Sequence, residues 1–298
     1  MDIRVLRYFI AVANEETISA AAKRLHLTQP TLSRQLKELE TELGTTLFVR
    51  GKRKISLTEE GLFLLKKAQE IVELADKAEA DLKRPKEAIA GDIHIGAGET
   101  HAMQLIAKAS RKLAVRHPDI RFHLYSGNAD DIAEKLDKGL LDFGVVIEPS
   151  DKRKYDYLRL PAADVWGVLM RKDSPLAEKP SIKPADLVGQ PLLVSRQTAV
   201  GNEISGWFGR DAGELNITAS YNLLYNATWF VEENIGYALC IDQLINTSGT
   251  SNFCFRPLEP KLEASLNFVW KKHQAFSSAA HAFLDQVREE IARADGAG

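Results

Sequence analysis

Residues 17–44 read TISAAAKRLHLTQPTLSRQLKELETELG, and this stretch decides the architecture of the N-terminal part of the chain. Thr17 can cap a short alanine-rich helix over residues 18–24, which a three-residue connection follows. Thr28 is a second N-cap, and Pro30 falls in the first turn, where a missing N–H costs nothing. The closing glycine ends the second helix. The apolar residues of that helix recur at i, i+4, i+7 and i+11 and predict one apolar stripe: Leu32, Leu36, Leu39 and Leu43.

The opposite face of the second helix is polar. Two helices joined by a tight turn form a helix-turn-helix layout, in which the second helix presents its N-terminal residues to base edges in the major groove. Arg34 can offer a two-pronged donor to guanine, and Gln29 can pair with adenine. A solvated face on an ordinary amphipathic helix is the alternative. The candidate DNA contacts on this helix are Gln29, Pro30, Thr31, Ser33, Arg34 and Lys37.

Residues 47–57 predict two short strands around a basic turn that contains glycine, which is a hairpin or wing. Its cations would straddle the DNA backbone and give affinity without sequence information: Arg50, Lys52, Arg53 and Lys54. Residues 1–58 carry ten Lys/Arg and six Asp/Glu, a balance of +4, whereas the remaining 240 residues carry 29 and 35, a balance of −6. This asymmetry indicates that only the N-terminal part meets a polyanion.

A long helix is predicted over residues 59–84, with an acidic first turn and Pro85 at its end. A solitary helix of this length needs a partner for its apolar stripe, either a second copy of the chain or its own domain. The stripe runs in alternating three- and four-residue steps through Leu62, Leu65, Ala68, Val72, Ala75, Glu79 and Leu82.

Residues 1–60 resemble the N-terminal domain of the LysR-type transcriptional regulators. The matching text is LRYF at 6–9, SAAAKRL at 19–25, TQPTLSRQL at 28–36, LE at 39–40, LG at 43–44, LFVR at 47–50 and LTEEG at 57–61. The resemblance implies a winged helix-turn-helix whose helix at 29–39 reads DNA. It also implies that the helix at 59–84 is a linker that pairs antiparallel in a homodimer, with many members forming tetramers. The implied dimerisation residues are Leu62, Leu65, Val72 and Leu82.

From Gly91 onwards, strands and helices alternate, which indicates βαβ units and largely parallel sheets. Predicted strands include 92–97, 120–125, 143–147, 165–170, 191–194, 217–221, 237–241 and 266–270, and a C-terminal helix follows from Ser277. The family resemblance implies a bilobed fold similar to periplasmic binding proteins, with a small-molecule effector between the lobes. We predict three domains: a DNA-binding domain at 1–58, a linker at 59–88 and an effector domain at 89–298. Lobe I would comprise 89–162 and 266–298, and lobe II 163–265.

Ligands of such sheets bind beyond the carboxyl ends of the strands, opposite helix N-termini. This rule selects Glu99, Thr100, His101, Glu148, Ser195, Arg196, Gln197, Tyr225 and Asn226 as candidate effector contacts. The alternative is that Thr100 and Asn226 are helix caps, with a helix opening at Asn226, and that His101 and Arg196 are surface residues. Arg196 favours an effector carboxylate, whereas Glu99 and Glu148 favour an amine or hydroxyl, so the effector stays open.

Other classes of function have little support in the sequence. There is no HExxH motif, Cys/His cluster, GxSxG elbow or P-loop, so we predict no metal, cofactor or catalytic residue. Two cysteines, no secretory signal and no 18-residue apolar run predict a cytoplasmic protein without a membrane span. The main prediction is an effector-responsive regulator that binds double-stranded promoter DNA and itself, with RNA polymerase as a candidate partner. The alternatives are an enzyme tethered to DNA and a ligand-independent architectural protein.

Overall fold

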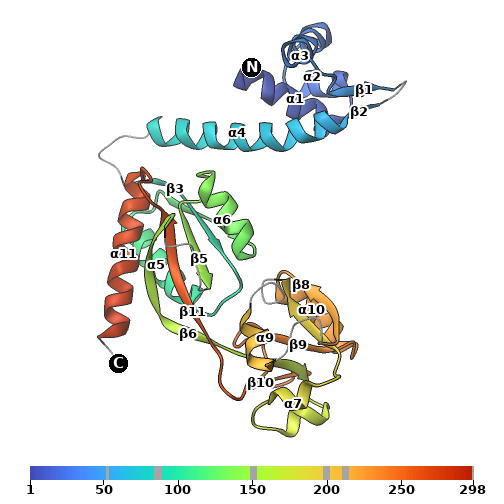
Figure 1. Cartoon of the computed structure of the whole chain (residues 1–298). Helices are drawn as coiled ribbons and strands as arrows, with labels where there is room; N and C mark the ends of the chain where they lie inside the picture. The colour runs from blue at the N-terminus through green and yellow to red at the C-terminus, as the bar shows by residue number, and fades with distance from the viewer. Residues whose placement is uncertain (52–53, 84–88, 148–152, 197–201, 210–214, 297–298) are drawn as a thin grey trace. The chain divides into compact units, whose positions relative to one another are not determined.

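The structure is a computed structural model that describes residues 1–51, 54–83, 89–147, 153–196, 202–209 and 215–296. The chain divides into two compact units, Met1–Arg84 and Pro85–Gly298, and each is described by itself (Figure 1). The long helix groups with the N-terminal unit.

The described residues of the N-terminal unit, called the head below, form four helices and a hairpin: α1 Ile3–Glu15, α2 Ile18–Arg24, α3 Gln29–Leu43, β1 Phe48–Arg50, β2 Ile55–Leu57 and α4 Glu59–Lys83. Its core joins the apolar faces of α1 and α3, with Phe9 tilted against Phe48 at a ring-centroid distance of 5.1 Å. Leu32, Leu36 and Leu39 are at most 2% exposed, so the predicted stripe is buried over these three positions.

The predicted ends of α3 are confirmed, and one of its stripe positions is not. The Thr28 hydroxyl accepts a hydrogen bond from the Thr31 N–H, and Gly44 takes the left-handed conformation at φ 64°. Leu43, however, is 40% exposed and lies outside the core of the head, because the chain turns away at Gly44.

The cap of α2 gives a test of local stability in the head. The Thr17 hydroxyl accepts a hydrogen bond from the Ala20 N–H at 3.2 Å. We expect Thr17→Ala to destabilise α2 by about 1 kcal/mol, since one first-turn N–H loses its acceptor. Hydrogen exchange of the α2 amides should then accelerate about fivefold. Thr46→Ala, whose side chain caps no helix, is the control, and equal rates in α2 for both variants would contradict the expectation.

The C-terminal unit is built on one nine-stranded sheet with the order β4-β3-β5-β11-β6-β9-β7-β8, and β10 pairs with β6. In lobe I, strands β3 Gly91–Ala97, β4 Ile120–Ser126 and β5 Phe143–Ile147 run parallel. Helices α5 Met103–Arg116 and α11 Ser278–Asp295 pack with the core of one sheet face, and α6 Ala129–Asp137 packs with a separate cluster on the other. The two faces are visible in Figure 1.

Lobe II repeats this layering. Strands β7 Leu192–Ser195, β8 Ile217–Tyr221 and β9 Tyr237–Ile241 run parallel, and β10 Phe253–Pro257 lies antiparallel to β6. One core includes α7 Pro184–Leu187, α9 Asn202–Phe208 and the 3-10 helix η1 Pro175–Glu178, and a second core includes α10 Leu224–Glu232.

Two strands pass between the lobes, β6 Tyr155–Arg171 and β11 Glu263–Lys271. The sequence predicted a strand only over 165–170, which lies in the second half of β6. Their ladder pairs Arg159 with Asn267 and Ala163 with Ser265, and its register shifts between these pairs. Pro161 falls at that irregularity, where its missing N–H breaks no regular pairing.

Candidate functional site

The outer face of α3 is solvent-exposed from its first turn. Gln29, Pro30, Thr31, Arg34 and Lys37 are all exposed, and Ser33 is half-buried. The Ser19 hydroxyl donates to Gln29 Oε1 at 3.3 Å, so the start of α2 orients the first side chain of α3. The hydroxyls of Thr28 and Thr31 are 2.8 Å apart and hydrogen-bonded. This end of α3 therefore presents several donors and acceptors to solvent.

An acidic residue, missed by the sequence analysis, lies on the same face. Glu38 Oε1 is 3.7 Å from Arg34 Nε, and Glu38 Oε2 accepts from Gln35 Nε2 at 2.7 Å. Both charged side chains are largely exposed, so this i,i+4 pair is weak and the guanidinium can exchange it for another acceptor. The i,i+4 spacing was the signal that could have identified Glu38.

The hairpin is anchored beside the helix-turn-helix. Strands β1 and β2 pair antiparallel with Phe48 opposite Leu57, and the Ile55 N–H donates to the Glu16 carbonyl at 2.7 Å. Lys54 is exposed and forms an ion pair with Glu16. Lys52 and Arg53 lie outside the described residues, as does the side chain of Arg50.

Helix α4 has two apolar faces rather than one. Leu65, Ala68 and Val72 pack on the core of the head, and an ion pair between Arg7 and Asp76 fixes α4 to α1. Of the four predicted dimerisation residues, Leu65 and Val72 thus lie on the head side of the helix. Leu62 and Leu82 are exposed. The exposed apolar side chains of α4 are Leu62, Phe63, Ile71, Leu74 and Leu82.

Lobe I and lobe II meet at the loop that follows β3. The Thr100 hydroxyl donates to Asp164 Oδ2 at 2.6 Å and accepts from the Ala102 N–H at 3.1 Å. Asp164, on β6, is only 3% exposed, and burial raises the pKa of its carboxyl, an effect that the Thr100 hydrogen bond partly offsets. Thr100 therefore fixes the β3–α5 loop to the strand that crosses between the lobes.

The neighbouring residue forms a second link between the lobes. Glu99 Oε2 accepts a hydrogen bond from the Leu224 N–H, in the first turn of α10. Leu223 is the N-cap of α10 and makes no side-chain cap bond. A carboxylate from lobe I thus caps a helix of lobe II, where the positive end of the helix dipole favours it.

A cavity of about 480 Å³ opens beside these links. Its lining includes Glu99, Thr100 and His101, the three predicted effector contacts that follow β3. The remaining lining residues come from β3, α5, β4 and the segment after β9: Ile95, Ala97, Gly98, Met103, Gln104, Leu124, Tyr125, Ser126, Gln243 and Leu244.

Comparison with known proteins identifies the family. The chain matches the bacterial regulatory helix-turn-helix model of the lysR family over residues 3–62 and the LysR substrate binding domain over residues 86–292. The chain belongs to the LysR family. It is a DNA-binding transcriptional regulator with a domain for a small-molecule effector, and its predicted fold class is confirmed.

Relatives of this regulator match most or nearly all of the chain. The Hca operon transcriptional activator HcaR of Escherichia coli is 31% identical over 98% of this chain and 99% of its own length. The Bacillus subtilis regulator BsdA is 35% identical over 70% and 73%. Full-length CbnR in complex with its target DNA has the same fold, with a TM-score of 0.74 at 20% identity over 97% of this chain and 100% of CbnR. These relatives are transcriptional regulators rather than enzymes.

Among the described residues, the other predicted effector contacts of the regulator, Ser195, Arg196, Tyr225 and Asn226, do not line the cavity. Arg196, Tyr225 and Asn226 are exposed, and Ser195 is half-buried at the end of β7. Glu148 and Gln197 lie outside the described residues. Asn226 does not open a helix, because α10 begins two residues earlier and takes its cap from Glu99.

The sequence analysis did not select Tyr125 and Ser126, which line the cavity, or Asp164, which accepts the Thr100 hydrogen bond. Tyr125 and Ser126 follow from the strand-end rule, which the sequence analysis did not apply to the strand at 120–125. Asp164 carried a weaker signal, as an acid next to an apolar strand.

The two cysteines of the regulator are buried and free. Burial raises the pKa of both thiols, that of Cys240 strongly, so both carry their protons at neutral pH. Among the described residues, no group of three or more His, Cys, Asp or Glu is placed to hold a metal ion. The helices in that part of the chain include none long and apolar enough to cross a membrane.

Proposed function

We propose that this regulator reads promoter DNA with the exposed N-terminal face of α3 and senses a small molecule in the cavity beside Glu99, Thr100 and His101. The observation that carries the proposal is the position of that cavity. It borders the two hydrogen bonds that join the lobes, Thr100 to Asp164 and Leu224 to Glu99. A ligand there can favour one arrangement of the lobes over another through its differential affinity.

DNA recognition would combine base contacts and phosphate contacts made by different residues of the head. Arg34 and Gln29 supply donors and acceptors that match base edges, and Lys37 and the wing cations supply phosphate contacts. Effector binding would change the spacing of two heads in an oligomer and hence their contacts with the promoter and with RNA polymerase. Because promoter DNA is the target, we infer a cytoplasmic location.

The test is to map genomic binding sites with the purified full-length protein at physiological salt, starting beside its own gene. We expect footprints over a dyad with half-sites in successive major grooves. Genes that flank the footprint nominate effectors, and a true effector should change the footprint. If a folded oligomer protected no specific DNA site, the proposal would be refuted. If no candidate metabolite changed the footprints, the result would support a protein that acts without a ligand.

The Glu99 link gives a prediction of its own. We expect Glu99→Ala to weaken the contact between the lobes by about 1.5–3 kcal/mol, since the α10 terminus loses a charged acceptor. Hydrogen exchange at the Leu224 amide should accelerate about 10- to 160-fold. Glu99→Gln, which keeps an acceptor but loses the charge, should give an intermediate rate.

The matched control is Glu233→Ala, which removes an exposed carboxylate from the other end of α10. It should leave the exchange of Leu224 unchanged. Equal protection of Leu224 in Glu99→Ala and in the parent chain would show that the carboxylate does not hold the lobes together.

A further inference from the structure

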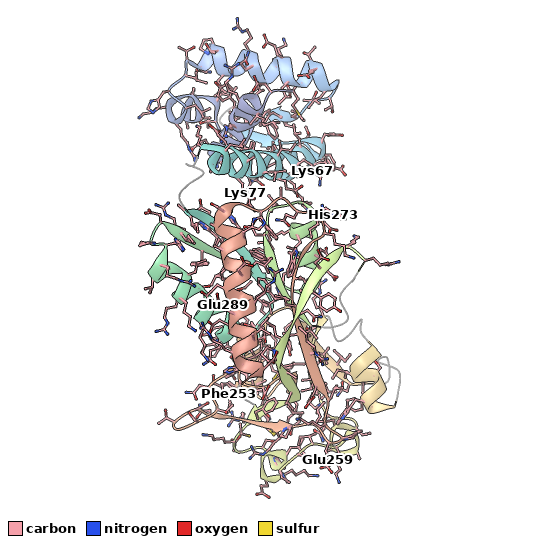
Figure 2. All side chains as sticks on the ribbon, turned by 90° about the vertical axis from the view of Figure 1, so that its left-hand side faces the viewer. Lys67, Lys77, Phe253, Glu259, His273 and Glu289 are labelled. Atoms are coloured by element: carbon pink, nitrogen blue, oxygen red, sulfur yellow. The ribbon has the colours of Figure 1, made fainter. Side chains whose placement is uncertain are left out.

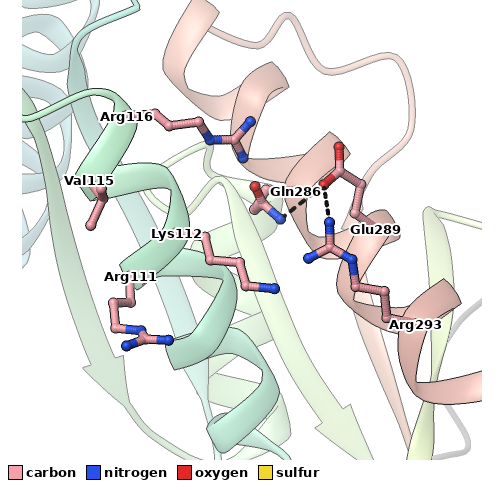
Figure 3. A pocket seen from close by; sticks show the side chains of 7 residues that line it. All are labelled: Arg111, Lys112, Val115, Arg116, Gln286, Glu289 and Arg293. Carbon is pink, nitrogen blue, oxygen red and sulfur yellow. Dashed lines mark hydrogen bonds and ion pairs between the residues drawn. The ribbon is translucent and has the colours of Figure 1, made fainter. Parts of the chain in front are cut away.

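A groove of about 420 Å³ runs between α5 and α11 on lobe I (Figure 3). Figure 2 shows α11 at the front of its unit, with Glu289 midway along it. The groove shares no residue with the cavity beside Glu99. It is lined by Arg111, Lys112, Val115 and Arg116 from α5 and by Gln286, Glu289 and Arg293 from α11.

A saturated charge network supports the groove. Glu290 Oε1 accepts hydrogen bonds from Lys112 Nζ at 2.6 Å, Arg293 Nη1 at 3.0 Å and Gln286 Nε2 at 3.1 Å. The Lys112 hydrogen bond is the largest cause that lowers the pKa of Glu290, so this carboxyl is ionised at neutral pH. These contacts join the two helices and fix the position of Gln286.

Three polar groups at the groove remain without partners in the described part of the chain. Neither the Arg111 nor the Arg116 guanidinium has an ion-pair or hydrogen-bond partner there. Gln286 is 2% exposed, and its Oε1 accepts no hydrogen bond from any described residue. Figure 3 shows this oxygen turned towards the α5 side of the groove, whereas the amide nitrogen faces Glu289. A buried acceptor without a donor is costly, and it indicates a missing partner.

The charges at the groove favour an anion. Arg111, Lys112, Arg116 and Arg293 contribute +4, and Glu289 and Glu290 contribute −2, which leaves +2. Glu289 is itself held by Arg293 at 3.4 Å and by Gln286 at 3.3 Å. The guanidiniums of Arg111 and Arg116, which have no partners among the described residues, therefore make the electrostatic potential positive at the α5 side of the groove.

We propose that this groove is a second binding site, for a small multivalent oxyanion that also carries a hydroxyl or N–H donor. Arg111 and Arg116 start about 7.5 Å apart along α5 and about 140° apart around it, so each can hold a separate acidic group of a ligand that spans the groove. The donor of the ligand satisfies Gln286 Oε1. Phosphorylated and polycarboxylate metabolites both meet this description.

The test is titration calorimetry on the full-length protein at constant ionic strength. Inorganic phosphate and citrate are the two probes, because citrate carries three carboxylates and a hydroxyl. Saturable binding of phosphate supports the phosphorylated class, and saturable binding of citrate supports the polycarboxylate class. Binding of neither probe at millimolar concentration overturns the proposal.

The variant Arg111→Gln/Arg116→Gln locates the site. We expect it to weaken binding of the active probe about tenfold or more for each arginine lost. The control, Lys108→Gln/Arg121→Gln, removes the same charge from exposed positions of lobe I outside the groove. It should change binding less than about twofold, as expected for exposed charges in salt. If both double variants lost the same affinity for the probe, binding would reflect general electrostatic attraction rather than a site at the groove, which would overturn the proposal.

Discussion

Arg34→Ala should abolish sequence-specific DNA binding while leaving the head folded. The side chain is 72% exposed and its partner Glu38 is also exposed, so the substitution removes no core contact. A good bidentate contact to a base contributes about 1–3 kcal/mol, and a dimer on a dyad presents the contact twice. We therefore expect a loss of about 2–6 kcal/mol, or roughly 30- to 25,000-fold in affinity for the mapped site.

The measurement is fluorescence anisotropy with the mapped site and with a shuffled duplex at one salt concentration. Arg34→Ala should lose affinity for the mapped site mainly. Arg34→Lys keeps the charge but lacks the planar fork, so it should preserve non-specific binding and lose discrimination. Arg4→Ala, on the exposed side of α1, is the matched control. Equal losses on both duplexes for Arg34→Ala would assign Arg34 to the DNA backbone.

The elements that could be predicted from the sequence are those fixed by local chemistry. Thr17 and Thr28 cap α2 and α3, and the apolar periodicity of α3 matches its burial through Leu39. These signals act within one or two turns of helix, so a single sequence contains them. Leu43 fits the same periodicity and is exposed, since its burial depends on whether another element covers that turn.

The links between the lobes could not be predicted in this way. Glu99 and Leu224 are separated by 125 positions, and their contact depends on how β6 and β11 carry the chain between the lobes. Likewise, the first half of β6 was not predicted, because its irregular pairing with β11 depends on residues far along the chain. The strand-end rule nevertheless selected Glu99, Thr100 and His101, because the end of β3 is a local feature.

The sequence also merged two faces of α4 into one stripe. Three- and four-residue steps through Leu65, Ala68 and Val72 describe the side that packs on the head. Phe63, Ile71, Leu74 and Leu82 follow at i, i+8, i+11 and i+19, which fall within one arc of about 100° on a helix. Lys67, which Figure 2 labels on α4, also lies within that arc, and its ammonium forms an ion pair with Glu70 at 3.2 Å. We propose this second face as the homodimer interface.

Leu74→Glu should separate the dimer into monomers. Leu74 is 44% exposed in the single chain, and fully burying an exposed leucine contributes about 1.5–3 kcal/mol, so covering the exposed part contributes about 0.7–1.3 kcal/mol. In a two-fold interface the substitution removes two such contributions and also places two carboxylates in the interface, so we expect association to weaken by at least about 1.3–2.6 kcal/mol. Sedimentation equilibrium on the full-length protein measures this as a rise in the dimer dissociation constant of roughly tenfold or more.

Gln69→Glu supplies the matched control, because it introduces the same charge on α4 at an exposed position outside the Phe63–Leu82 face. It should leave the dimer intact. If Leu74→Glu and Gln69→Glu were equally dimeric, the Phe63–Leu82 face would not be the interface, and Leu62 would be the next position to test. A monomer presents only one α3 helix to DNA, so Leu74→Glu should also reduce a footprint over two half-sites to weak protection of a single site. Arg34→Ala differs, because it should remove specific binding while the dimer stays intact.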